Sequence, residues 1–181
     1  MESKNLGVPN FSANSVWRKI VPAKICFFIW TVAHRKILTI DMLQKRGWSL
    51  ANRCTLCCKD EESIHHLLIS CSFTHHVWNL IRRRCNLNNL PISDDIAFTI
   101  KEWPLDVPKC GDGWLCYYAF HATCWFIWLE RNSRIFSDIM KSPDQIARRI
   151  LMNVAGWFVA KEKVDRTATA AWLRARLQLI E

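Results

Sequence analysis

Three cysteines and one histidine, spaced as C-x2-C-x8-H-x4-C, are the residues of this sequence best suited to chemistry. They are Cys54, Cys57, His66 and Cys71. Zn²⁺ binds sulfur and imidazole nitrogen in a tetrahedron, and three thiolates with one imidazole fill a closed structural site. A C-x2-C pair can hold the ion from one tight turn, and a later H-x4-C pair can supply two more ligands from the ends of a short helix. The spacing therefore predicts a structural zinc site of the Cys3His type.

Neighbouring residues leave alternatives to this ligand set. Cys58 could replace Cys57, and His65 could replace His66. A group of buried thiols would also fit the pattern, because free cysteine is often buried as a small apolar residue. From His66 to Cys71 is slightly more than one turn at ~3.6 residues per turn, so a bend at the helix end would bring both to one ion.

A helical hairpin is predicted just before the cysteines. Pro22 suits the first turn of a helix over residues 23–35, because proline is tolerated at that position. Thr39 is a predicted N-cap for a second helix over residues 40–46, and Gly47 is its predicted C-terminal stop.

Two short helices are predicted around the second ligand pair. Ser63 is placed to cap a helix that runs to about residue 69, and a further helix follows over residues 74–84. Arginines 82–84 end that helix, where positive charge suits the negative end of the helix dipole. We interpret them as a solvated helix end, with a phosphate-contacting patch as the alternative.

The second half of the sequence also predicts helices. A turn-rich break at residues 86–91 precedes a short helix that ends near Trp103, with acidic residues at its start. Residues 114–129 carry no charged side chain over 16 positions and continue as a helix to about residue 136. Sixteen residues span only ~24 Å, short of a ~30 Å bilayer core, so a buried helix is predicted rather than a membrane span. The run Ser-Pro-Asp-Gln at residues 142–145 predicts the start of a last long helix, which runs to about residue 163.

Composition supports a mainly α protein with a basic surface. Half of the 181 residues are apolar, glycine is scarce at five, and strand patterns are poor, so helices around a real core are expected. We predict an irregular lead-in over residues 1–14, a zinc-binding domain over 15–85, a linker with a short helix over 86–113, and a helical C-terminal region over 114–181. The formal charge of +9 favours a polyanionic partner, of which nucleic acid is the commonest.

The cysteine count and the N-terminal segment point to a reducing compartment. Nine cysteines is an odd number, and the first 14 residues lack the apolar core of a signal peptide. We therefore expect thiols that are reduced or metal-bound, in an intracellular protein of the nucleus or cytoplasm that is not secreted.

Several ordered motifs resemble one family. Val-Pro-Ala-Lys-Ile-Cys-Phe-Phe-Ile-Trp at residues 21–30, Leu-Thr-Ile-Asp-Met-Leu at 38–43 with Arg-Gly at 46–47, and the cysteine and histidine segment at 54–71 are similar to the reverse-transcriptase zinc-binding domain of plant non-LTR (LINE-type) retrotransposons. The resemblance implies that His66, which precedes a leucine in the motif, takes the ligand position and that His65 is variable. Residues 125–136, which contain Trp-Leu-Glu-Arg-Asn, are similar to sequence that follows this domain in such elements.

Catalytic motifs of such elements are not found in the sequence. Asp94 and Asp95 lack the aromatic lead of a reverse-transcriptase aspartate pair, and helix capping accounts for them. Asp112 is the nearest hint of a ribonuclease H carboxylate, and a loop beside Gly113 accounts for it. We therefore expect no catalytic activity from this chain.

The predicted function is a zinc-binding module that binds RNA or single-stranded DNA as an accessory to reverse transcription. Lysine and arginine would contact phosphates and exposed tryptophan would stack on unpaired bases. The candidate contacts near the metal are Lys24, Arg35, Lys36, Lys45, Arg46, Arg53 and Lys59. The alternatives are a structural or protein-interaction module, which would use the apolar C-terminal helices for a partner or self-association, and a decayed transposon remnant with no selected activity.

Overall fold

The structure is a computed structural model that describes residues 13–85, 96–103 and 113–162, and five single positions between 167 and 174. Several predictions fall outside these residues. They concern the lead-in before residue 13, most of the predicted linker, the acidic residues 94, 95 and 112, and most of the C-terminal tail.

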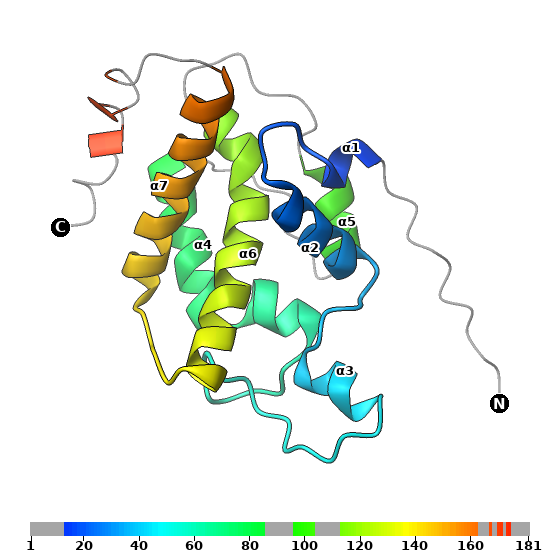
Figure 1. The fold of residues 1–181 in the computed structure, drawn as a ribbon. Coiled ribbons are helices and arrows are strands. Elements are labelled where there is room, and N and C mark those ends of the chain that lie inside the picture. Colours follow the sequence, from blue (N-terminus) through cyan, green and yellow to red (C-terminus); the bar gives the residue numbers. More distant parts are fainter. Residues whose placement is uncertain are drawn as a thin grey trace.

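Helices account for all the regular structure in the described residues, which confirms the mainly α prediction (Figure 1). In chain order they are α1 (Ala13–Val16), α2 (Ala23–Ala33), α3 (Ile40–Gln44), the π-helix η1 (His66–Ser70), α4 (Ser72–Cys85), α5 (Ile96–Glu102), α6 (Gly113–Phe136) and α7 (Pro143–Glu162). The helices predicted from sequence are present with ends shifted by a few residues. Neither the π-helix nor α1 was predicted, and the first two residues of α1, Ala13 and Asn14, fall in the segment that was predicted to be irregular.

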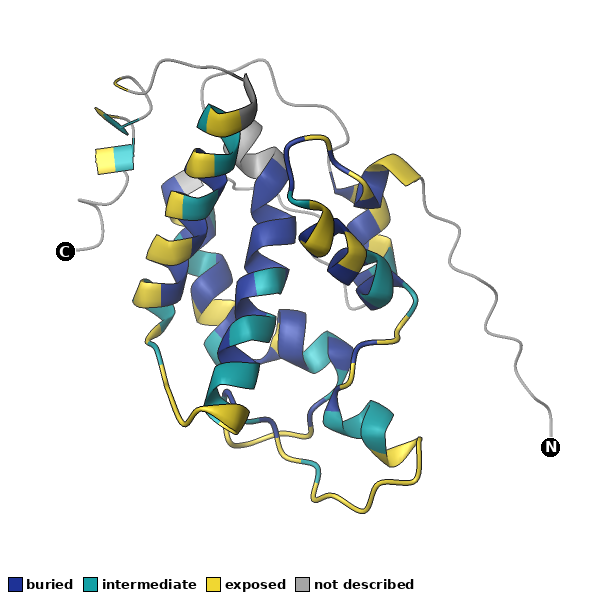
Figure 2. Cartoon of the chain, in the orientation of Figure 1, coloured by how far each residue is buried: buried dark blue, intermediate teal, exposed yellow. Residues whose placement is uncertain are grey.

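Helix α6 runs through the middle of the molecule and packs against α2, α4 and α7 (Figures 1 and 2). Its described side chains from Tyr118 to Arg131 are buried or partly buried, and only its C-terminal end is exposed. A helix that is apolar on all sides must be covered on all sides. The prediction of a buried core helix is thus confirmed, and no helix among the described residues has the length and apolarity needed to cross a membrane.

Helix α7 starts with the predicted capping box. The backbone N–H of Gln145 donates to Ser142 Oγ at 3.3 Å, and the backbone N–H of Ser142 donates to Gln145 Oε1 at 2.9 Å. These two bonds satisfy amides that have no partner within the helix. The cap fixes the start of α7 after the short turn that reverses the chain from α6.

The end of α4 differs from the sequence interpretation. Arg84 is not part of a solvated helix end, because its side chain is only 4% exposed and lies 3.7 Å from Asp144 at the start of α7. Arg83 is exposed and Arg82 is partly buried. The prediction was wrong for Arg84 because α7 packs along α4 and covers that face, which a single helix read by itself does not reveal.

One hydrophobic core joins the two halves of the chain. Trp78 on α4, Trp103 after α5 and Phe120 on α6 are all buried, with ring centroids 5.0 to 6.1 Å apart. Trp78 belongs to the predicted zinc-binding domain and Phe120 to the predicted C-terminal region. The domain boundaries themselves stay a prediction, since the segment around residue 90 lies outside the described residues.

Candidate metal centre

The four predicted side chains converge. The ligand atoms of Cys54, Cys57, His66 and Cys71 all lie within 4.8 Å of one another. Cys54 Sγ is 3.9 Å from Cys71 Sγ, and Cys57 Sγ is 3.4 Å from His66 Nε2. Tetrahedral zinc with Zn–S near 2.3 Å and Zn–N near 2.0–2.1 Å separates two sulfurs by about 3.8 Å and a sulfur from a nitrogen by about 3.6 Å. The donor set therefore fits one tetrahedral ion in both chemistry and spacing.

The first ligand pair is held by a tight turn. The backbone N–H of Cys58 donates to the carbonyl of Cys54 at 2.9 Å, and the N–H of Cys54 donates to the carbonyl of Asp60 at 2.8 Å. Cys58 has a φ of 55°, a left-handed conformation that lets the chain reverse directly after the second ligand. The turn brings Cys54 and Cys57 to the same side, as a C-x2-C grip on one ion requires.

The second pair is brought together by one turn of π-helix. The backbone N–H of Cys71 donates to the carbonyl of His66 at 2.8 Å, an i to i+5 bond. Five residues exceed one α-turn of ~3.6 residues, so an ordinary helix would send the two side chains to different faces. The wider π-turn places Cys71 above His66, and this is the physical reason that H-x4-C can act as a pair.

The cysteine at the end of this turn favours its charged form. Cys71 is fully buried and directly precedes α4. A hydrogen bond with the Cys54 thiol lowers the pKa of Cys71, and burial opposes the change. The backbone N–H groups of Thr74 and Phe73 at the start of α4 also lower it, and together these causes give a pKa of about 5. Thiolate is the form that binds zinc.

The two alternative ligands lie outside the cluster. Cys58 is exposed, and its sulfur lies 3.8 Å from the carbonyl oxygen of Thr55. His65 borders a separate cleft together with Arg35 and Asp41. The geometry thus groups Cys57 and His66 with the other two cysteines.

A buried carboxylate joins the ligand loop, which we define as residues 52–62, to two helices. Glu62 is fully buried, and its Oε1 accepts the N–H of Ile40 at 2.9 Å at the start of α3. Arg131 of α6 donates to both oxygens of Glu62, at 2.7 and 3.2 Å. Thr39 holds the N-cap position of α3 as predicted, but its hydroxyl bonds to Asp41, and Glu62 satisfies the amide instead.

A second arginine of α6 holds the backbone of the same loop. Arg134 Nη1 donates to the carbonyls of Thr55 and Leu56, at 3.3 and 3.1 Å, between the first two cysteines. Glu130 accepts from Arg134 Nε at 2.8 Å and from the N–H of Lys141 at 2.8 Å, which orients the guanidinium. The last turns of α6 therefore clamp the ligand loop from outside the cluster.

Sequence reasoning missed these positioning residues. Glu62 and the segment from Glu130 to Arg134 both fall in the motifs quoted above, but 69 positions separate Glu62 from Arg131. A charged residue inside an otherwise apolar helix was the available signal, because a buried charge requires a partner. The sequence does not say which acid that partner is.

The seven candidate nucleic-acid contacts are all exposed. Lys45 pairs with Asp41 at 2.9 Å, and Arg53 donates from Nε to the carbonyl of Cys58 at 2.8 Å. Lys24 and Lys36 lie over tryptophan rings on and beside α2. Trp48, in the loop after α3, is 62% exposed. The role of the seven cations in binding nucleic acid stays a prediction.

The fold and the cluster define a helical zinc-binding protein with a Cys3His centre. Residues 2–78 match the family described as zinc-binding in reverse transcriptase, so this part of the chain is a zinc-binding domain of the reverse-transcriptase type with zinc as its structural cofactor. The matched segment ends at Trp78 within α4, whereas the arginines that clamp the ligand loop come from α6.

The chain also has a distant relative in a plant. The chain is 26% identical over 148 residues to a protein of Arabidopsis thaliana that carries the provisional name ribonuclease H protein. The alignment covers 76% of this chain and 22% of the relative, so the chain spans about a fifth of the length of that protein. No solved structure matches the chain.

Proposed function

We propose that Cys54, Cys57, His66 and Cys71 hold one structural zinc ion, and that the domain so formed binds single-stranded nucleic acid as a non-catalytic accessory to reverse transcription. The observation that carries the proposal is the convergence of the four ligand atoms within 4.8 Å, two of them from the ligand loop, which also carries the exposed cations Arg53 and Lys59. An intracellular setting, in the nucleus or cytoplasm, is part of the proposal.

Zinc, when bound, supplies a cross-link and no reaction chemistry, because four protein ligands leave no open position for substrate. The chain's own residues do the remaining work. Arg131 and Arg134 of α6 orient the ligand loop through their hydrogen bonds to it, and α6 itself is fixed by its packing in the hydrophobic core. Lysine and arginine on the outer surface then contact phosphates, a sequence-independent attraction that weakens as salt rises.

The ligand assignment is tested by paired variants. We expect Cys54→Ser and His66→Ala to lower the zinc content of purified protein, measured by elemental analysis. The matched controls are Cys58→Ser and His65→Ala, which change the same residue types one position from a proposed ligand. Full zinc content in the first pair, or loss of zinc in the controls, would overturn the assignment.

Nucleic-acid binding is tested with a salt series. The zinc-loaded chain should bind single-stranded RNA at low salt, with an affinity that falls steadily as salt increases. The double variant Arg46→Gln/Lys59→Gln removes two of the exposed candidate cations and should flatten that slope while zinc content stays complete. No binding at low salt, or a response independent of salt, would reject this function.

The non-catalytic part of the proposal has its own test. The Arabidopsis relative is named for ribonuclease H, and this chain covers 22% of its length. We expect the purified chain to leave an RNA–DNA hybrid intact with Mg²⁺ present. Cleavage that survives repeated purification would contradict the proposal.

The alternative of a protein-interaction module predicts different behaviour in solution. The protein-interaction alternative rests largely on the apolar helix α6. In the structure α6 is covered by α2, α4 and α7 of the same chain, so its described apolar part offers little surface to a partner. Self-association that persists at high salt without nucleic acid, measured by size-exclusion chromatography, would favour that alternative over nucleic-acid binding.

A further inference from the structure

Helix α2 presents a row of aromatic rings at the surface. Phe27, Trp30 and His34 are spaced three and four residues apart, so they share one side of the helix. The rings of Phe27 and Trp30 stack with centroids 5.6 Å apart and planes 23° apart, and the Trp30 and His34 centroids are 4.5 Å apart. Phe27 is 56% exposed and, unlike a singly exposed apolar residue, it adjoins further rings, so together they form a contiguous apolar surface of the kind that marks interaction sites.

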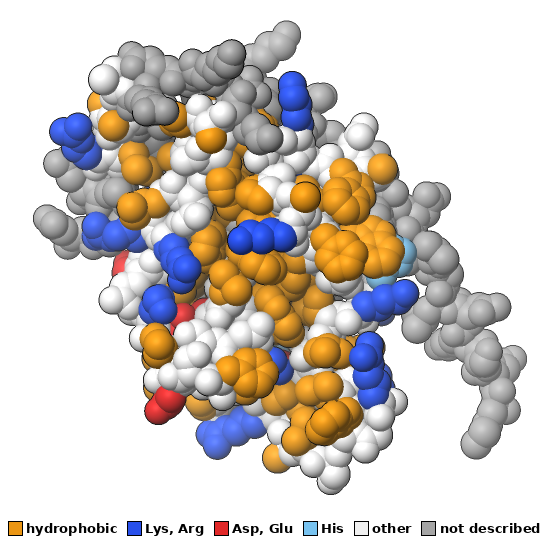
Figure 3. Space-filling view, viewed as in Figure 1, with side chains coloured by type: hydrophobic (Ala, Val, Ile, Leu, Met, Phe, Trp, Pro, Cys, Tyr) orange, Lys and Arg blue, Asp and Glu red, His pale blue; other side chains and the backbone are white. Residues whose placement is uncertain are grey.

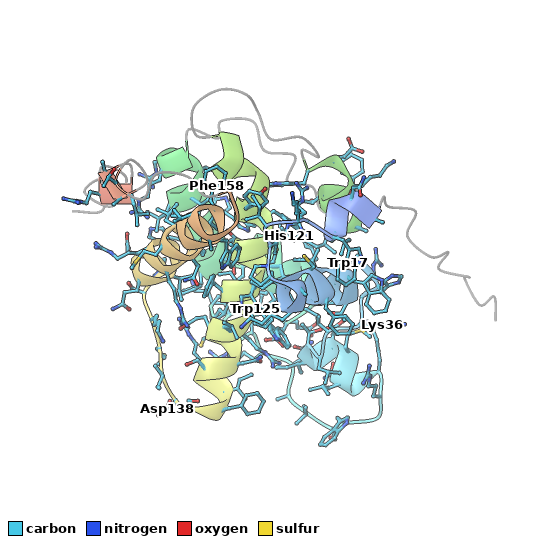
Figure 4. The ribbon with its side chains drawn as sticks, turned by 45° about the horizontal axis from the view of Figure 1, so that its top comes forward. Trp17, Lys36, His121, Trp125, Asp138 and Phe158 are labelled. Carbon is cyan, nitrogen blue, oxygen red and sulfur yellow. The ribbon has the colours of Figure 1, made fainter. Side chains whose placement is uncertain are left out.

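Cations border this row. Lys36 Nζ lies 5.9 Å from the centroid of the Trp30 ring, and Lys24 Nζ lies 5.9 Å from that of Trp125 on α6. Figure 4 shows Trp125 beside α2 and Lys36 near its C-terminal end. We define Phe27, Trp30 and His34 with Lys24 and Lys36 as the aromatic face.

Acidic residues are missing from the part of the sequence that forms this face. Residues 13–40 contain five lysines and arginines and no aspartate or glutamate. In the space-filling view, apolar side chains gather across the middle of the surface with lysine and arginine between them, and the few acidic side chains lie mostly toward the lower left (Figure 3). Charge and shape thus match a polyanion that also carries flat apolar rings.

A cleft extends the aromatic face at the N-terminal end of α2. Its volume is about 640 Å³, and its lining includes Trp17, Lys19, Ala23 and Trp157. Trp17 is 48% exposed. Ala23 is one helical turn before Phe27, so the cleft continues the same side of the helix.

We infer that the aromatic face binds unpaired bases of a single-stranded polynucleotide, with Phe27 and Trp30 stacking on bases while Lys24 and Lys36 contact phosphates. This inference rests on the proposed nucleic-acid binding and names its surface and ligand class. Every base has a π-face, so stacking tolerates any sequence but requires a base that is free of a partner strand. Helix α2 has 11 residues and so spans about 16 Å, the length of about five stacked nucleotides at ~3.4 Å each.

The test uses the zinc-loaded full chain and fluorescence anisotropy. The probes are a single-stranded RNA, the equivalent DNA and an abasic strand, each of about twelve nucleotides, and a duplex of the same length. The abasic strand keeps the phosphates and removes the bases. We expect Phe27→Ala to weaken binding of the RNA about 5- to 150-fold and to leave the abasic strand unaffected. Phe98→Ala, a comparably exposed phenylalanine on α5, is the matched control and should change neither.

The lysines have a separate readout. Lys24→Gln and Lys36→Gln should each reduce the slope of log affinity against log salt by about 0.7, the value for one phosphate contact on a single strand. Lys101→Gln, an exposed lysine on α5, should leave the slope unchanged. Zinc content and helix content report whether each variant is folded.

The outcomes separate this inference from the proposed function. Salt-dependent binding that is equal for abasic and complete strands, or is unaffected by Phe27→Ala, would overturn the aromatic face and leave nucleic-acid binding standing. Duplex binding as tight as single-strand binding would do the same. Self-association that depends on Phe27 would assign the face to a second copy of the chain and overturn the inference. Failure of every strand to bind at low salt would overturn both proposals.

Discussion

The ligand loop and the helix bundle of α2, α4, α6 and α7 are ordered by different forces. In residues 52–62 the buried side chains are a thiol, a leucine and a carboxylate, Cys54, Leu56 and Glu62. The bundle buries mainly apolar side chains around α6. Apolar burial contributes ~25 cal/mol per Å² whatever the direction of contact, whereas a thiolate or a carboxylate stabilises only with its partner in place.

The difference teaches where each region is vulnerable. The bundle can lose one side chain and keep its arrangement, because many small contacts share the load. The loop depends on a few specific bonds, to a metal ion and to two arginines of α6. The conformation of the ligand loop therefore depends on the metal ion and on α6, whereas the packing of the bundle depends little on the loop.

Removal of zinc should have the largest effect. Structural zinc contributes ~10–16 kcal/mol in small peptide sites, against a typical domain stability of ~5–15 kcal/mol. We expect chelation, or Cys71→Ser, to unfold the ligand loop and η1 while α6 and α7 stay helical. Hydrogen exchange measured by mass spectrometry would resolve the two regions, and unchanged protection of the loop after exhaustive chelation would contradict the comparison.

Truncation of a core side chain should also have a large effect, but it should lower the stability of the helix bundle and leave the zinc site intact. Phe120 is 1% exposed and packs against two tryptophans, so Phe120→Ala should cost about 4 kcal/mol, within the ~3–5 kcal/mol of such truncations. Urea unfolding gives the magnitude, and elemental analysis should still find one zinc per chain in the folded protein. Phe136→Ala, at a 77% exposed position on the same helix, is the control and should be near neutral.

Breaking the contact between the two regions should have a somewhat smaller effect. Removal of one partner of a buried ion pair costs ~3–5 kcal/mol. Arg131→Ala belongs at the lower end, about 3 kcal/mol, because the N–H of Ile40 still bonds Glu62 Oε1. Urea unfolding measures the cost, and hydrogen exchange should show loosening of both α3 and the ligand loop.

A double-mutant cycle sharpens that prediction. The cycle consists of Glu62→Leu, Arg131→Met and the two together. The double variant removes both charges, so it should be more stable than Arg131→Met alone. If the two changes added independently, the clamp would not couple the loop to the bundle.

Loss of the α7 cap should have the smallest effect. Ser142→Ala removes the oxygen that accepts the Gln145 amide and should cost about 1 kcal/mol, seen as a lower melting temperature. Zinc content and loop protection should not change, because the cap belongs to the bundle alone. A loss of zinc in this variant would show that the two regions are less separate than we argue.

Much of the local structure could be predicted because its causes are local. Ser142 lies only three residues from Gln145, its partner in the cap. The long apolar run of α6 predicts a buried helix, because a helix that is apolar on all sides must be covered on all sides. The convergence of the four candidate ligand side chains was predicted from spacing, since they lie within 18 residues and ligand chemistry restricts the choice.

Other features were not predictable because their causes are distant. Arg84 is buried only because α7 passes over it, and Glu62 meets Arg131 across 69 positions. The π-turn at His66 places two residues that are five positions apart on the same side of the chain. Helix propensities of single residues do not predict such a turn.

The sequence by itself determined most of the helices to within a few residues, and which four side chains could share a metal ion, because these depend on contacts within a few turns of chain. Only the tertiary structure decided which charges are buried together, how α6 holds the ligand loop and which rings remain at the surface. Those depend on packing between segments that are far apart along the chain, where many pairings are chemically acceptable and geometry selects one.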